Sequence, residues 1–213
     1  MMSFQPRGQM VFPEFTGARC YMMPFIQGRA DSLPAAYAGY GEVVEAFSLP
    51  GQEGQLGLIT IDESFVEAGQ SQRGYGAGER TIHTEACLSG KRLSWGPSPF
   101  PTWGPSPYVC LEEGVRVMIA NSIADTCMVW DVAVTDTTPN GDLSARADEF
   151  PRETGRLMGA GEVMEIGIFT PHEPIRQREN GNRQFFRIVG TGVTGREEYF
   201  TRNELLERVG ILH

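Results

Sequence analysis

Glycine and proline interrupt this chain too often for long helices to dominate its fold. The 26 glycines and 14 prolines make 40 of the 213 residues, and both residue types end or weaken helices and favour turns. The apolar segments between them are short, and their Val, Ile, Phe and Met content is typical of strands. We expect strands at Leu56–Phe65, Thr81–Leu88, Val115–Ala120, Thr126–Val134, Glu162–Phe169 and Arg183–Val193.

One segment departs from this pattern and carries helical periodicity. Apolar residues recur at spacings of three and four between Leu33 and Phe47, and Ser32 followed by Pro34 is a helix-start signal. We therefore predict a helix over residues 32–48 that packs on a sheet, and a short second helix over residues 203–209. Strands that follow a single helix, without regular strand–helix alternation, favour an antiparallel barrel or sandwich over parallel α/β folds.

The chain has the length of one domain with a sizeable core. We predict a single domain over residues 1–213, in which residues 1–31 form an extended arm and residues 56–193 form a β-barrel. The sequence Trp-Gly-Pro-Ser-Pro occurs twice, at residues 95–99 and 103–107. Because proline is not accommodated in the interior of a sheet, this repeat predicts a surface flap over residues 95–107.

Composition excludes several classes of function. The net charge of -9 argues against a nucleic-acid-binding surface. No apolar run reaches the roughly 18 residues of a membrane span, and the first ten residues lack the apolar stretch of a secretion signal. We therefore expect a cytoplasmic or virion-associated protein. The four cysteines form no Cys-x-x-Cys pair, which predicts free thiols rather than a zinc site: Cys20, Cys87, Cys110 and Cys127.

Two of the three histidines lie in sequence contexts that suggest a metal-binding site. His83 and Glu85 lie two residues apart in a predicted strand and therefore project from the same face. His172 follows the predicted strand that ends at Phe169. If the fold brings these residues together, two imidazoles and one carboxylate form the ligand set of a non-haem iron centre, with open positions for O₂ and a co-substrate.

Arginines follow the second of these histidines on a predicted strand. Arg183 and Arg187 share one face of that strand. A guanidinium in this position can bind a carboxylate through two parallel hydrogen bonds. The alternative is that these arginines pair with acidic neighbours such as Glu173 or Glu179.

The order of His-x-Glu, a distal histidine and then a nearby arginine resembles the 2-oxoglutarate- and Fe(II)-dependent oxygenases over residues 81–190, with Glu85 where that family usually has aspartate. The resemblance implies a double-stranded β-helix, the jelly-roll barrel of cupin-like proteins. It implies iron ligation by His83, Glu85 and His172, and binding of 2-oxoglutarate by Arg183 or Arg187. The implied dioxygenase reaction is oxidation of an unactivated C–H bond in a small-molecule or protein substrate.

A second interpretation needs no metal. A jelly-roll structural subunit of a virion or another large complex would act through protein partners or self-assembly. Gly/Pro-rich loops and an N-terminal region rich in methionine, a residue that adapts to varied contact surfaces, favour this interpretation. The two interpretations differ in one structural expectation, because only the enzyme requires the two histidines to converge.

Overall fold

A computed structural model of the chain describes residues 3–71, 80–89, 92–95, 105–106, 115–136, 141–190 and 200–208. The fold is mainly antiparallel β, as the short apolar segments predict. Within the described residues, no helix is long and apolar enough to cross a membrane.

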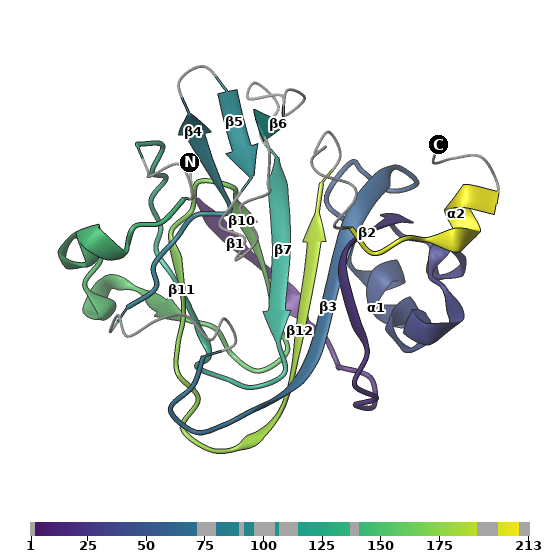
Figure 1. Cartoon of the computed structure of the whole chain (residues 1–213), viewed down its shortest axis with the longest axis horizontal. Coiled ribbons are helices and arrows are strands. Elements are labelled where there is room, and N and C mark those ends of the chain that lie inside the picture. Colours follow the sequence, from purple (N-terminus) through teal and green to yellow (C-terminus); the bar gives the residue numbers. More distant parts are fainter. Residues whose placement is uncertain are drawn as a thin grey trace.

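The largest element is a six-stranded antiparallel sheet. Its strands lie in the order β1 (Phe4–Gln9), β10 (Glu162–Gly167), β7 (Arg116–Asn121), β12 (Gly181–Val189), β3 (Leu56–Val66) and β2 (Arg19–Ile26). The longest pairing joins β12 to β3, from Gly181 opposite Val66 to Val189 opposite Leu58. Figure 1 shows β7, β12 and β3 side by side at the centre of the molecule, with α1 beyond β3 and β11 on the other side.

A smaller sheet faces the inner side of this large sheet. It contains β11 (His172–Pro174), β8 (Cys127–Val129) and β9 (Arg156–Leu157) in the order β11-β8-β9. An isolated bridge between His83 and His172 adds the segment around residue 83 to the free side of β11. A third small sheet is formed by β4 (Ala86–Ser89), β5 (Arg92–Trp95) and β6 (Pro105–Ser106).

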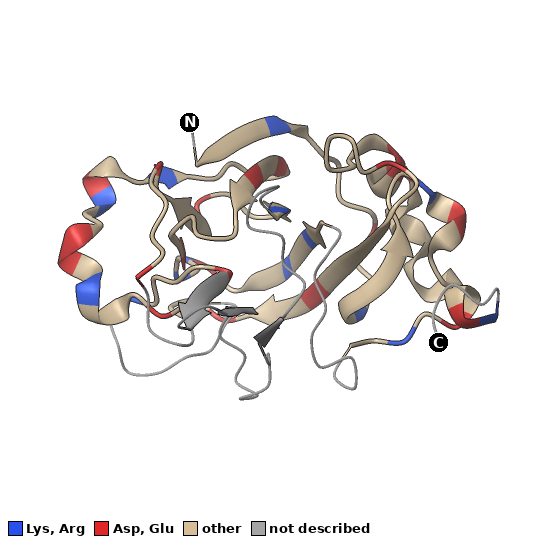
Figure 2. Cartoon of the chain, turned by 90° about the horizontal axis from the view of Figure 1, so that it is seen from above, with Lys and Arg blue, Asp and Glu red and all other residues tan. Residues whose placement is uncertain are grey.

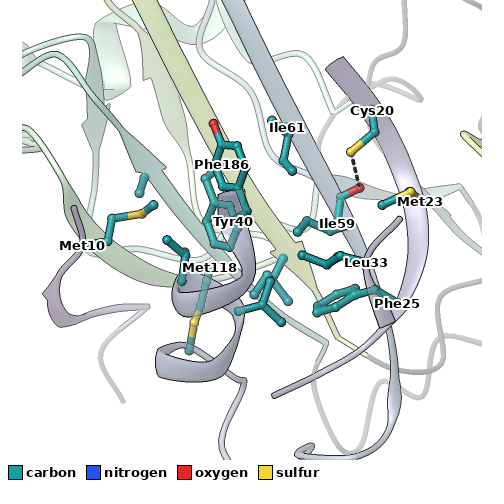
Figure 3. Packing of buried hydrophobic residues seen from close by; sticks show 14 of the residues in the cluster. Met10, Cys20, Met23, Phe25, Leu33, Tyr40, Ile59, Ile61, Met118 and Phe186 are labelled. Carbon is teal, nitrogen blue, oxygen red and sulfur yellow. Dashed lines mark hydrogen bonds between the residues drawn. The ribbon is translucent and has the colours of Figure 1, made fainter. Parts of the chain in front are cut away.

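The outer face of the large sheet is covered by short helical segments. These are η1 (Ala30–Ser32), η2 (Ala35–Tyr40) and α1 (Gly41–Ala46). The predicted helix over residues 32–48 is therefore confirmed only in part, because its first half forms 3₁₀ turns. Its apolar residues pack on the sheet as expected, and Tyr40 stacks on Phe186 of β12 with ring centroids 6.1 Å apart (Figure 3).

Two further apolar layers complete the packing. The layer between the two sheets includes Val117, Val129 and Ile166. The other layer covers the outer side of the small sheet and includes Trp130 and Phe150. Next to this layer lie η3 (Ser144–Glu149) and η4 (Arg152–Thr154). Figure 2 shows acidic and basic residues mixed along these two 3₁₀ segments, so neither sign of charge forms a separate surface there.

The structure corrects several sequence expectations. The predicted extended arm over residues 1–31 does contain extended strands, but it is part of the main fold, because β1 and β2 are the two edge strands of the large sheet. The N-terminal methionines Met10, Met22 and Met23 are buried in the chain's own core, so the described residues offer no methionine-rich contact arm. The C-terminal helix is confirmed as α2 (Glu204–Arg208). Most of the predicted flap over 95–107 lies outside the described residues.

Glu63 on β3 fastens the N-terminal segment to the outer face of the sheet. Its Oε2 accepts hydrogen bonds from the backbone N–H groups of Thr16, at 2.7 Å, and Ala18, at 2.9 Å. Its Oε1 accepts from the Tyr40 hydroxyl and the Gln184 side-chain amide. Burial raises the pKa of Glu63, but these hydrogen bonds outweigh it and lower the pKa to about 2.

This carboxylate makes stability depend on pH. Because the folded-state pKa of about 2 lies below the ordinary 4.5, the contribution of Glu63 is fully present above pH 4.5 and is lost as the pH falls toward 2. We predict that Glu63→Gln lowers the free energy of unfolding at pH 7 by about 2–4 kcal/mol. It should also weaken the pH dependence of urea unfolding in this acidic range. The exposed Glu14→Gln is the control, and equal stability of Glu63→Gln and wild type would contradict the prediction.

Candidate functional site

The two predicted histidine ligands meet across the small sheet. The backbone N–H of His83 donates to the carbonyl of His172 at 3.0 Å, and the reverse bond is 2.9 Å long. The two imidazole centroids lie 4.1 Å apart with an interplanar angle of 61°. Both side chains are buried. The sheet pairing therefore brings together two residues that lie 89 positions apart in the sequence.

Strand alternation explains why these side chains face the interior. Ile82 packs into the apolar layer on the outer side of the small sheet, so His83 and Glu85 point to the inner side. Val129, the pairing partner of His172, belongs to the layer between the sheets. The His-x-Glu motif and the distal histidine therefore reach the same space from neighbouring segments.

The backbone fixes the orientation and tautomer of both rings. Nδ1 of His83 lies 2.9 Å from the carbonyl oxygen of Thr81, and Nδ1 of His172 lies 3.0 Å from that of Thr170. A carbonyl oxygen only accepts hydrogen bonds, so each Nδ1 carries a proton. Nε2 is then the nitrogen of each ring that is left to bind a metal ion or a second proton. This arrangement is common in metal-ligating histidines, whose second nitrogen donates to a carbonyl or carboxylate.

Glu85 lies between the histidine pair and an arginine of the large sheet. Its Oε1 is 3.5 Å from Nε2 of His172, and its Oε2 is 2.9 Å from Nη1 of Arg187. The side chains of Glu85 and Arg187 are 4% and 5% exposed, so this ion pair has little contact with water. A lone pair on His172 facing a carboxylate is unfavourable, whereas a cation or a second ring proton between the two atoms makes the contact attractive.

Arg187 is held on several sides. Its Nη2 donates to Thr60 Oγ1 at 3.2 Å and lies 3.4 Å from the sulfur of Met22. Burial lowers the pKa of Arg187, but the charge of Glu85 outweighs this effect and raises the pKa above its usual value. The guanidinium is therefore charged at any pH at which the protein is folded.

Arg183 projects from the same face of β12, four residues before Arg187, with Phe185 between them on that face. One of its amino groups donates to the side-chain oxygen of Asn121, while Nε and Nη1 have no hydrogen-bond partner among the described residues. Burial lowers the pKa of Arg183 to about 10. This side chain is thus a buried cation with donors left over, which is costly unless an anion accepts from them.

The arginines do not pair with the neighbours that the sequence suggested. Glu173 is bound instead by Arg80 at 2.9 Å and Arg152 at 2.8 Å, on the outer side of the small sheet. The sequence gives no sign of the contact between Arg80 and Glu173, because only the fold brings Arg80 to β11. His213, the third histidine, lies outside the described residues.

The donor atoms of His83, Glu85 and His172 suit a metal ion, although they are not arranged around a single ion position. Within the described part of the chain, no group of three or more His, Cys, Asp or Glu side chains is arranged to hold a metal ion as it stands. Two imidazoles with basic Nε2 atoms and one carboxylate are nevertheless the donor set of non-haem iron sites. Arg187 holds Oε2 of Glu85, which leaves Oε1 on the side of His172.

Comparison of the chain with protein-family models, curated protein sequences and solved structures gives no match. Functional inference therefore depends on the geometry of the site itself.

The ion pair predicts a strong stability effect. Replacing Arg187 by methionine leaves Glu85 buried without its cationic partner, so we expect Arg187→Met to cost about 3–5 kcal/mol in urea unfolding. Adding Glu85→Gln removes the isolated charge and should recover a large part of this loss. The exposed Arg19, which pairs with Asp62 at 2.9 Å, is the control, and Arg19→Met should cost less than about 1 kcal/mol. If Arg187→Met lowers the free energy of unfolding by less than about 1 kcal/mol, the assignment of a buried ion pair between Glu85 and Arg187 is refuted.

Proposed function

We propose that this protein is a non-haem Fe(II)- and 2-oxoglutarate-dependent dioxygenase-like enzyme. The observation that carries the proposal is the convergence of His83, Glu85 and His172, which come from two distant segments and meet in the layer between the sheets. The enzyme interpretation requires this convergence, and the structural-subunit interpretation gives no reason for it.

The strand pairing supports a jelly-roll, or double-stranded β-helix, for the same chain. The segment around residue 83 is taken as a strand, and β4–β6 of the third sheet are left out. On this basis β3 and the seven strands that follow it pair as a folded hairpin. The first, β3, pairs with the last, β12, and the second, around residue 83, pairs with the seventh, β11. The third and sixth, β7 and β10, pair next, and β8 pairs with β9. Further pairing of β12 with β7 and of β11 with β8 joins successive turns.

In this proposal His83, Glu85 and His172 are the iron ligands. The carbonyl groups of Thr81 and Thr170 hold the two rings so that Nε2 is the ligating nitrogen. Bound iron would supply O₂ activation for oxidation of a C–H bond. Three protein ligands of this kind would leave open positions on the iron for O₂ and the co-substrate.

Arg183 is the side chain that we assign to 2-oxoglutarate. Arg187 is engaged by Glu85, whereas Arg183 keeps Nε and Nη1 without acceptors among the described residues. A carboxylate of 2-oxoglutarate would accept from both groups in a bidentate arrangement. The interior charges also favour a dianion, because Arg183, Arg187 and Glu85 sum to +1 before a divalent cation is added.

One observation favours the second candidate, a metal-free jelly-roll structural subunit. The ion pair of Glu85 with Arg187 neutralises the carboxylate without any metal. A barrel with only a structural role would keep this pair as part of its core.

Anaerobic calorimetry with Fe(II) separates the two candidates. We expect wild type to bind one Fe(II) and His172→Ala to lose at least about tenfold in affinity. Adding 2-oxoglutarate should tighten Fe(II) binding in wild type, and Arg183→Met should abolish that tightening without removing Fe(II) binding itself.

The matched control is Glu165→Gln, a buried carboxylate bound by Arg7 and Arg116 on the outer face of the large sheet. This variant should bind Fe(II) as wild type does. Absence of Fe(II) binding by folded wild-type protein would reject the oxygenase and leave the structural subunit.

A further inference from the structure

A cavity borders Arg187, the residue that binds Glu85 of the candidate iron site. It has a volume of about 420 Å³ and lies between β2, β3 and β12. Its walls include Arg19, Tyr21, Thr60, Asp62, Phe185 and Arg187. Arg187 therefore contacts both this cavity and Glu85, one of the proposed iron ligands.

A β-bulge in the edge strand β2 shapes the cavity. Between the pairs of Cys20 with Ile61 and Met23 with Ile59, two residues of β2 stand opposite Thr60 alone. Met22, the second of the two, has a φ of 48°. This left-handed conformation is strained for a side chain other than glycine, and such strain collects at functional sites.

The bulge changes which residues face Arg187. Alternation continued from Cys20 would place Met22 on the outer face of the sheet, yet Met22 packs with the layer between the sheets. Its sulfur reaches Nη2 of Arg187 at 3.4 Å, and its backbone N–H donates to Thr60 Oγ1 at 3.1 Å. Tyr21 also faces this side, with Arg187 6.0 Å from the centre of its ring. Bulges next to active sites commonly redirect side chains in this way.

One N–H group of Arg187, at Nε, has no acceptor among the described residues. The residue is 4% exposed. The other two nitrogens are engaged by Glu85 and Thr60. A buried N–H of a charged group without an acceptor is costly, so an acceptor brought by a ligand would stabilise the site.

We propose that this cavity binds a small organic carboxylic acid, with a carboxylate oxygen accepting from Nε of Arg187. The rings of Tyr21 and Phe185 would pack against its carbon skeleton. The charged residues that line the cavity are Arg19, Asp62 and Arg187, and their charges sum to +1, which favours an acid over a base. The assignment of this acid as the substrate to be oxidised rests on the proposed function, whereas its binding can be measured without metal.

The test is an amide NMR titration of the metal-free, full-length protein with benzoate, compared with its neutral counterpart benzamide. We expect benzoate to shift the signals of Tyr21, Thr60 and Phe185, and benzamide to bind at least about tenfold more weakly. Arg187→Lys keeps the positive charge but removes the Nε donor, so it should weaken benzoate binding at least about tenfold. Arg19→Gln, at the exposed rim, should change the affinity by less than about threefold.

Each other outcome overturns a defined part of the inference. No binding of benzoate at millimolar concentration, equal binding of benzamide, or shifts confined to another surface would reject the carboxylate site. Displacement of benzoate by 2-oxoglutarate in the metal-free protein would reject the substrate assignment, because the cavity would then hold the co-substrate. Failure of Fe(II) binding together with normal benzoate binding would reject the oxygenase while the carboxylate site stands. If Arg187→Lys does not fold, the contrast between benzoate and benzamide in wild type decides the result.

Discussion

The ion pair between Glu85 and Arg187 is the interaction around which the interior of this protein is organised. It joins the segment beside the small sheet to the middle of the large sheet, and both partners are almost fully buried. Taking two charges out of water is unfavourable unless their geometry and further hydrogen bonds compensate. The contacts of Arg187 with Thr60 and Met22 supply part of that compensation. The polar interior is thus built from several strands that surround one guanidinium.

The two carboxylate oxygens of Glu85 face different residues. Its Oε2 belongs to Arg187, while its Oε1 faces Nε2 of His172. A cation near Oε1 would add ligands from both histidines, whose rings are already oriented by backbone carbonyl groups. Without a cation, Arg187 alone neutralises the carboxylate. This arrangement therefore suits the proposed metal centre and also neutralises the buried carboxylate of Glu85 in the metal-free chain.

Two arginines on one face of β12 divide the interior into two regions. Arg183 lies toward Asn121 and has spare donors there, whereas Arg187 borders the cavity formed by the bulge of β2. The proposed co-substrate and the proposed carboxylic acid therefore use different guanidinium groups. The bulge at Met22 places the Met22 side chain, together with that of Tyr21, on the side of the sheet that holds Arg187.

The sequence by itself determined the strand-rich fold class, the positions of the long strands and the shared faces of His83 with Glu85 and of Arg183 with Arg187, because these follow from local periodicity. It did not reveal β1 or β11, whose short polar segments become strands only by pairing with β10 and β8. It also could not assign partners, since pairing Glu85 with Arg187 joins residues 102 positions apart. The bulge at Met22 and the cavity beside it are likewise products of tertiary packing. Local residue pattern set which side chains could act together, and only long-range strand pairing decided which of them meet.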